Sequence, residues 1–140
     1  MAIQSDPSIQ DVIAVAEFRS ALRHFLRRSE KIARHSGLTP QRYTLLMMIK
    51  GAADGSEQST VTELSDRMQL AQSTVTELVR RAESAGLIER EQSQRDARVA
   101  HLRLSAEGER RLMLSFTELD AERAQLREAF SNLDGGVTGH

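Results

Sequence analysis

The chain has 140 residues, no cysteine and a formal net charge of −1, and its length matches one ordinary domain spanning residues 1–140. The lack of cysteine excludes a disulfide framework, a thiolate nucleophile and a thiol redox switch. The near-neutral charge gives no global electrostatic case for nucleic acid, so any such case depends on where the charges lie. Because the N-terminus MAIQSDPSIQD carries no secretion signal and no apolar run of about 18 residues could span a membrane, we expect a cytoplasmic protein without a membrane partner.

The first predicted element is a long amphipathic helix that ends near Gly37, since glycine readily takes the left-handed conformation of helix ends. Thr39 and Pro40 then supply an N-cap and a first-turn proline for a second helix. Leu38 and Tyr43 have the spacing of a hydrophobic staple around this cap. Along the first helix, residues recur at alternating steps of three and four and form the seam of an amphipathic helix: Val15, Phe18, Leu22, Phe25, Ser29 and Ile32.

Two closely spaced helices follow. Thr60 and Glu63 form a capping box for a short third helix, and only residues 69–71 separate it from a fourth helix over residues 72–85. The fourth helix has one apolar and one polar face and ends at Gly86. A tight turn between two such helices is typical of a helix-turn-helix.

After residue 86 the apolar period changes from nearly four to two. The segments LIEREQ and VAHLRLS therefore predict two strands joined by the turn SQRDAR. Ser105 can cap one last helix, which is expected to run to residue 133. Its three-four seam, broken only by Arg123, consists of Leu112, Phe116, Leu119, Leu126, Phe130 and Leu133. The expected fold class is mainly α with a small β-hairpin: a winged helix-turn-helix lobe at 39–104 between long dimerisation helices at 1–36 and 105–133.

The segment STVTELVRRAESAGLIEREQSQRDARVAHLRLSAEGERRL resembles the recognition helix, wing and last-helix entry of the multiple antibiotic resistance regulator (MarR) family. LRHFLRRSEKIARHSGLTPQRYTLL is similar to that family's first two helices and TVTELSDRMQLAQSTVT to its helix-turn-helix, so the likeness covers about residues 15–125. Its most specific part is Asp96-x-Arg98, followed by a strand and by Ser105-x-x-Gly108. The resemblance implies a dimeric, ligand-responsive transcription factor, usually a repressor, whose effector is a small aromatic or anionic compound.

Three features depart from the family pattern. Ala71 lies where such helices commonly begin with a Ser or Asp cap, and Gln69 occupies a turn position that often holds Gly. A single last helix would also leave the chain without the family's usual final helix.

The outward residues near the start of the fourth helix have the chemistry of a major-groove reader. Glutamine can pair with adenine, hydroxyl groups bond to bases or phosphates, and threonine methyls pack on the thymine methyl. Glu77 would repel phosphates unless it accepts from cytosine or pairs with Arg80 or Arg81. The alternative interpretation is that this face is solvated polar surface without a binding role. With the hairpin following directly, we expect DNA contacts from Gln72, Ser73, Thr74, Thr76, Glu77 and Arg80.

The turn SQRDAR places an acid between two arginines. A guanidinium at a loop tip can enter the narrow, negative minor groove, and a neighbouring carboxylate could hold it in place beforehand. We therefore expect Asp96 to aim Arg98 at DNA, with Arg95 as a further groove or phosphate contact, although a chance surface ion pair is the alternative. Gln41 and Arg42 are expected to contact the DNA backbone, because they lie at the positive end of the second helix.

The seams of the first and last helices suit packing across a two-fold axis, which predicts a homodimer through Val15, Phe18, Leu22, Leu119, Leu126 and Phe130. One side of the first helix also carries a basic stripe of Arg23, Arg27, Lys31 and Arg34. Our first interpretation is that this stripe pairs with acidic residues of the partner's last helix. The second is that it contacts phosphates, and the third is that it is a solvated face without partners.

An enzyme is disfavoured. The histidines His24, His35, His101 and His140 lack metal-ligand spacing and base-forming partners, and neither a phosphate loop nor a nucleophile elbow appears, so we expect no metal and no cofactor. The effector site stays unknown, with Tyr43, His24, His35 and Arg42 as candidates that also have structural or phosphate-directed interpretations. The alternative function is a winged-helix module that binds only protein.

Overall fold

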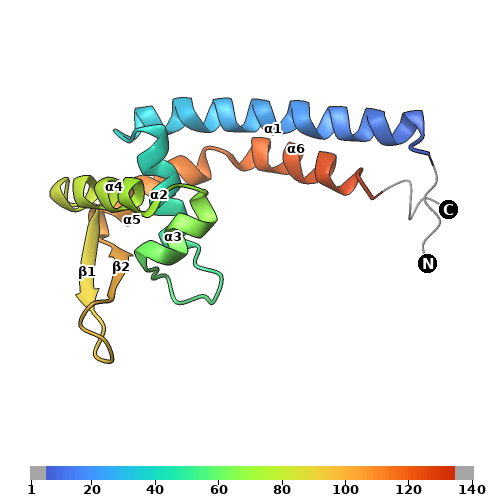
Figure 1. Ribbon diagram of the computed structural model, residues 1–140. Coiled ribbons are helices and arrows are strands. Elements are labelled where there is room, and N and C mark those ends of the chain that lie inside the picture. The colour runs from blue at the N-terminus through green and yellow to red at the C-terminus, as the bar shows by residue number, and fades with distance from the viewer. Residues whose placement is uncertain (1–5, 135–140) are drawn as a thin grey trace.

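The computed structural model describes residues 6–134, so residues 1–5 and most of the expected tail DGGVTGH, with His140, lie outside the described residues. Two helices lie side by side and extend from a lobe that carries a two-stranded hairpin (Figure 1). The elements in chain order are α1 (Ile9–His35), α2 (Pro40–Lys50), α3 (Val61–Met68), α4 (Gln72–Ser84), β1 (Ile88–Gln92), β2 (Ala100–Leu104), α5 (Ala106–Thr117) and α6 (Asp120–Ser131). The predicted fold class, mainly α with a winged helix-turn-helix, is confirmed.

The predicted helix caps are present. The hydroxyls of Thr39, Thr60 and Ser105 each accept a hydrogen bond from the backbone N–H three residues on, at 3.0–3.2 Å. Gly37 and Gly86 have φ of 75° and 76°, the left-handed values that end α1 and α4. Side-chain chemistry that is local in sequence therefore sets where these helices begin and end.

The core of the lobe is formed by apolar side chains of α2, α3, α4 and the hairpin. Strands β1 and β2 pair antiparallel from Ile88–Leu104 to Gln92–Ala100, and Ser59 extends the sheet by two backbone hydrogen bonds with Leu102, at 2.8 and 3.0 Å. The following residues have no exposed surface: Leu45, Leu46, Ile49, Leu64, Val75, Val79, Leu87 and Leu102. One continuous core thus holds α4 and the hairpin in a fixed relation.

The start of α5 is fastened directly to the end of the α4–β1 connection. Ser105 donates from its backbone N–H to the Leu87 carbonyl at 2.9 Å and from its hydroxyl to the Gly86 carbonyl at 2.6 Å. A Cβ at Gly108 would lie 2.1 Å from the Leu87 carbonyl oxygen, so only glycine allows this approach. The Ser105-x-x-Gly108 pair therefore joins the lobe to the helices that leave it.

The expectation of one unbroken last helix is wrong, because α5 ends at Thr117 and α6 begins at Asp120. Arg123 holds this break: its guanidinium lies 3.8 Å from the ring centre of Phe116, donates to the Phe116 carbonyl at the end of α5, and also donates to Asp120. The chain consequently has a final helix, α6, contrary to the expectation that it would lack one. Because of the break, the Leu119 side chain packs in the core of the chain and is only 1% exposed. Leu119 is therefore not available for the expected dimer interface.

Among residues 6–134, no helix combines the length and the apolar character needed to traverse a lipid bilayer.

Candidate nucleic-acid interface

Helix α4 presents a polar face to solvent because its apolar face is buried in the core. Val75, Val79 and Ala82 are 0% exposed. The side chains predicted to contact DNA lie on the outer part of the helix: Gln72, Ser73, Thr74, Thr76 and Arg80 are exposed and Glu77 is half-buried. The structure thus brings the six predicted α4 residues onto accessible surface.

The turn before α4 contains the two departures from the family pattern. Gln69 takes the left-handed conformation, with φ of 54°, and its side-chain amide donates to the Asp66 carbonyl at 2.6 Å. Glutamine therefore replaces glycine here by adding a hydrogen bond that offsets part of the backbone strain. Ala71 occupies the N-cap of α4. Its side chain has no hydrogen-bonding group, so it does not cap the first N–H groups of the helix.

Glu77 is held by two arginines of its own helix. Its carboxylate accepts from Arg80 Nε at 3.0 Å and Nη2 at 2.5 Å, and from Arg81 Nε at 2.9 Å. The hydrogen bonds from Arg80 and then Arg81 lower the pKa of Glu77 to about 2. The expected pairing of Glu77 with Arg80 or Arg81 is confirmed, and both arginines take part.

We define the wing as residues 88–104. Its tip is a compact turn around Asp96. Its carboxylate accepts from Arg98 Nε at 3.1 Å, from Arg98 Nη2 at 3.3 Å and from the Arg98 backbone N–H at 3.0 Å. The Ser93 hydroxyl accepts from the backbone N–H groups of Arg95 and Asp96, and the Gln92 amide donates to the Ala97 carbonyl.

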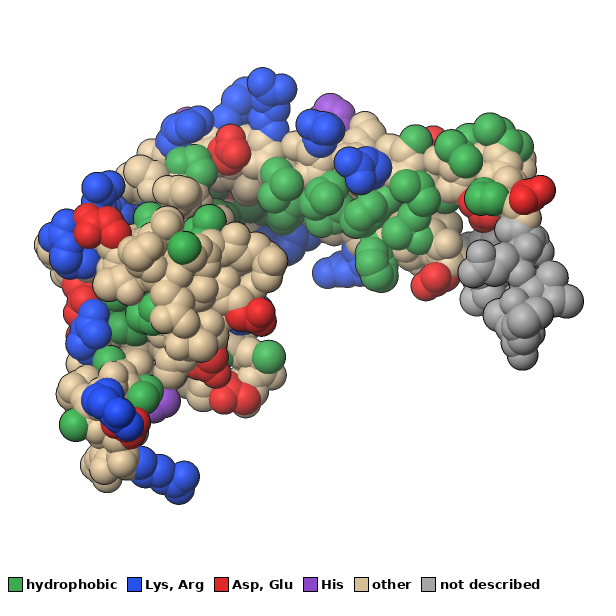
Figure 2. All heavy atoms as spheres, viewed as in Figure 1, with side chains coloured by type: hydrophobic (Ala, Val, Ile, Leu, Met, Phe, Trp, Pro, Cys, Tyr) green, Lys and Arg blue, Asp and Glu red, His purple; other side chains and the backbone are tan. Residues whose placement is uncertain are grey.

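Arg98 is held yet accessible. Its side chain is 90% exposed although Asp96 engages its guanidinium on two nitrogens. The bonds from the side chain and backbone of Arg98 lower the pKa of Asp96, so the acid stays charged at neutral pH. Basic side chains project from the tip of the wing, on the side of the lobe away from α1 (Figure 2). Asp96 therefore restricts the Arg98 side chain while leaving it open to solvent.

The start of α2 lies beside α4. Gln41, Arg42 and Arg81 line a hollow of about 270 Å³ together with Thr39, Pro40 and Leu78. The sequence-based prediction included Gln41 and Arg42 but missed Arg81, whose place beside them depends on how α2 packs near α4. Two arginines from different helices therefore converge beside the N-terminal end of α2, where N–H groups favour anions.

The family model described as the MarR family matches residues 36–99. The uncharacterized HTH-type transcriptional regulator YsmB of Bacillus subtilis is 30% identical over 122 residues, which cover 84% of this chain and 81% of YsmB. The chain belongs to the MarR family. It is a MarR-family transcriptional regulator and not an enzyme.

Solved structures of MarR-family proteins share this fold. An S. aureus MepR mutant bound to an oligodeoxyribonucleotide matches with a TM-score of 0.65 at 18% identity, over 87% of this chain and 91% of that one. An E. coli MarR mutant complexed with operator DNA matches with a TM-score of 0.63 at 18% identity, over 91% of this chain and 87% of that one. At these identities the likeness shows the fold alone.

The long helices of this MarR-family regulator pack on one another within the chain. The rings of Phe18 and Phe130 meet edge to face at 5.9 Å between centres, and Arg28 pairs with Glu122 at 3.4 Å. Leu22 and Leu126 are partly buried. In the described part of the chain, no ion pair engages the basic stripe of Arg23, Arg27, Lys31 and Arg34, so its pairing with a partner stays a prediction.

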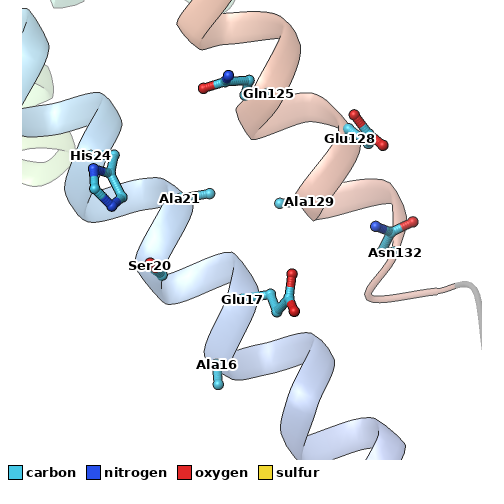
Figure 3. Close-up of a pocket in the computed structure, with 9 residues that line it drawn as sticks. All are labelled: Ala16, Glu17, Ser20, Ala21, His24, Gln125, Glu128, Ala129 and Asn132. Atoms are coloured by element: carbon cyan, nitrogen blue, oxygen red, sulfur yellow. The ribbon is translucent and has the colours of Figure 1, made fainter.

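A groove of about 560 Å³ runs between α1 and α6 at the level of the Phe18–Phe130 contact and is lined by residues of both helices. Ala21 and Ala129 point toward one another across it, with Glu17, His24 and Glu128 at its sides (Figure 3). The small side chains of Ala21 and Ala129 leave room for the groove on this side of the helix pair.

The four candidate effector-site residues do not converge. His24 lies in the α1–α6 groove, His35 borders a hollow beside Arg111, Arg42 lies next to α4, and Tyr43 is buried. Within residues 6–134, no cluster of three or more His, Asp or Glu side chains is arranged to hold a metal ion.

Proposed function

We propose that this regulator binds operator DNA as a homodimer, through α4 in the major groove and the wing in the minor groove, and acts as a repressor that a small effector releases. The observation that carries the proposal is the accessible Arg98 guanidinium, which Asp96 holds at the tip of the wing. The two related structures that contain DNA, those of the MepR and MarR mutants, support it by sharing the fold.

The face of α4 suits base reading. Gln72, Ser73 and Thr76 are exposed near its N-terminus, and an α-helix fits the major groove with its N-terminal residues at base edges. Gln41, Arg42 and Arg81 lie beside this face and would contact phosphates that flank the groove. Specificity and backbone attraction are thus divided between neighbouring residues.

The wing suits the minor groove. Fixing a long arginine side chain costs rotamer entropy, and Asp96 has already restricted Arg98 before DNA arrives. A narrow minor groove has the strongest negative potential and accepts single arginines. Arg95, exposed on the same turn, adds a second positive charge for a phosphate.

Exposed apolar surface supports the homodimer. Large hydrophobic side chains that remain strongly exposed among the described residues all belong to α1, α5 and α6: Ile9, Val12, Ile13, Val15, Leu26, Met113, Leu114 and Phe130. Figure 2 shows such side chains gathered along α1 and α6. Contiguous apolar surface of this kind is typical of an interface. Val15 and Phe130, at 49% and 59% exposed, would be buried by a second copy, together with the partly buried Phe18, Leu22 and Leu126.

Tyr43 supports a response to a small effector. Its side chain is 4% exposed and its hydroxyl has no hydrogen-bond partner among residues 6–134. Burial raises the pKa of Tyr43, and the nearby positive charge of Arg123 opposes that rise. A small aromatic compound with an anionic or acceptor group could bind the hydroxyl and the guanidinium together, at the junction of α2 with the α5–α6 break.

Repression follows from occlusion, since a dimer on two successive major grooves would exclude other proteins from that DNA. The alternative, a winged-helix module that binds only protein, uses the same fold without DNA. DNA binding itself separates the two functions.

The first prediction concerns the operator. Two α4 helices related by a two-fold axis should protect a pseudo-palindrome with half-site centres about 10 bp apart. Footprinting on duplexes that the protein enriches from a random pool measures this spacing. A dimer that enriches no sequence and shifts no DNA at low salt would favour the protein-binding module instead.

The second prediction concerns the dimer. Phe130→Glu places a charge in the proposed interface and should weaken dimerisation by about 2 kcal/mol or more, or roughly thirtyfold. Sedimentation across micromolar concentrations would measure it, with Ala124→Glu on another part of α6 as the matched control. A wild-type chain that sediments as a folded monomer at these concentrations would contradict the homodimer.

The third prediction concerns Tyr43. Tyr43→Phe removes a buried hydroxyl that lacks a partner, so the free energy of unfolding should rise by about 1 kcal/mol. The same change should abolish thermal stabilisation by any phenolic acid that stabilises the wild type. Chemical denaturation and thermal shift give the two readouts, and a less stable variant would show that the hydroxyl is already satisfied.

A further inference from the structure

Glu77 occupies the middle of the face that α4 turns to solvent. Ser73 precedes it by one turn, and Arg80 and Arg81 follow by one turn, so all four side chains are neighbours on the helix surface. A carboxylate at this position would lie among phosphates and base edges if α4 entered a major groove. A negative charge at this location lowers the affinity for DNA of any sequence, so Glu77 needs another explanation than general DNA binding.

The carboxylate engages the two arginines that would otherwise serve phosphates. Arg80 binds it with two nitrogens and Arg81 with one, so three guanidinium donors are directed at Glu77. All three side chains remain accessible, with exposed fractions of 64% for Arg80, 63% for Arg81 and 44% for Glu77. One acid thus cancels one of two positive charges and orients both arginines along the helix.

Sequence-independent DNA binding comes from phosphates, whereas base edges carry the sequence information. Glu77 weakens sequence-independent binding, because it repels phosphates and competes with them for the guanidinium donors of Arg80 and Arg81. In the major groove a carboxylate has one good partner, the N4 amino group of cytosine, which donates a hydrogen bond. The unfavourable effect of Glu77 would therefore be offset only on DNA that presents cytosine at its position.

We propose that Glu77 is a specificity-determining residue, which keeps Arg80 and Arg81 from the phosphates of unrelated DNA and accepts from a cytosine in the operator. The inference rests on the proposed DNA-binding function. In this role Glu77 discriminates against wrong sequences rather than adding affinity for the right one.

The test compares Glu77→Gln with the wild type on two probes: a duplex enriched from a random pool by the wild-type protein, and the same duplex with its sequence scrambled. Fluorescence anisotropy at two salt concentrations measures each affinity. Glu77→Gln should bind the scrambled duplex roughly fivefold tighter with a salt slope steeper by about one, and the enriched duplex no tighter. The ratio of the two affinities should fall accordingly.

Glu83→Gln is the matched control, because Glu83 lies on the same helix, pairs with an arginine (Arg90) at 2.8 Å and loses the same charge. It should change both affinities by one common factor and leave their ratio intact. Repeating the selection with Glu77→Gln should lose the preference for one G·C pair in each half-site.

An unchanged affinity ratio, or an unchanged selected sequence, would overturn the role of Glu77 while leaving DNA binding standing. Wild-type protein that enriches no sequence and binds neither probe would overturn the proposed function and this inference with it.

Discussion

The function of this chain depends on how α4 is docked. Val75, Val79 and Ala82 are fully buried, and a rotation of the helix that exposed them would push Glu77 or Arg80 toward the core, where an unpaired charge is very unfavourable. The orientation of the polar face is therefore set by the apolar one. Because α4, the hairpin and the start of α5 share one core, with Gly108 against the Leu87 carbonyl, the recognition helix and the wing keep a fixed relation.

Three arginines of the proposed DNA-facing surface are paired with acids within the chain. Arg98 has Asp96, and Arg80 and Arg81 share Glu77. Pairs on exposed surface contribute little to stability, so their role here is to orient the arginines rather than to hold the fold together. This arrangement reconciles a net charge of −1 with the proposed nucleic-acid interface: the positive charge is local, oriented and partly neutralised by acids beside it. The acids hold side chains in place and also weaken attraction to unrelated DNA.

Much of the fold could be predicted because its signals are local. Caps at Thr39, Thr60 and Ser105 and the left-handed glycines mark helix ends within a few residues of sequence. The break before α6 was not predicted, because the three-four seam is present on both sides of it and is interrupted only at Arg123. What decides it is Arg123, which binds the ring and the carbonyl of Phe116 only once the chain has turned.

The candidate site was predictable to a similar degree. The polar face of α4 and the Asp96–Arg98 pair follow from spacing within one element, so they were identified from sequence. Arg81 was missed because its place beside Gln41 and Arg42 depends on how α2 packs near α4. Residues that are distant in sequence and meet only through packing left no periodic signal.

The most direct test of the account is a double-mutant cycle at the tip of the wing, with DNA affinity measured for the wild type, Asp96→Ala, Arg98→Ala and the double variant. Because Asp96 acts by holding Arg98, Asp96→Ala should weaken binding despite removing a negative charge, and Arg98→Ala should weaken it by roughly tenfold or more. The double variant should bind no more weakly than Arg98→Ala. Tighter binding by Asp96→Ala alone would contradict the account, since it would mean that the acid only repels DNA.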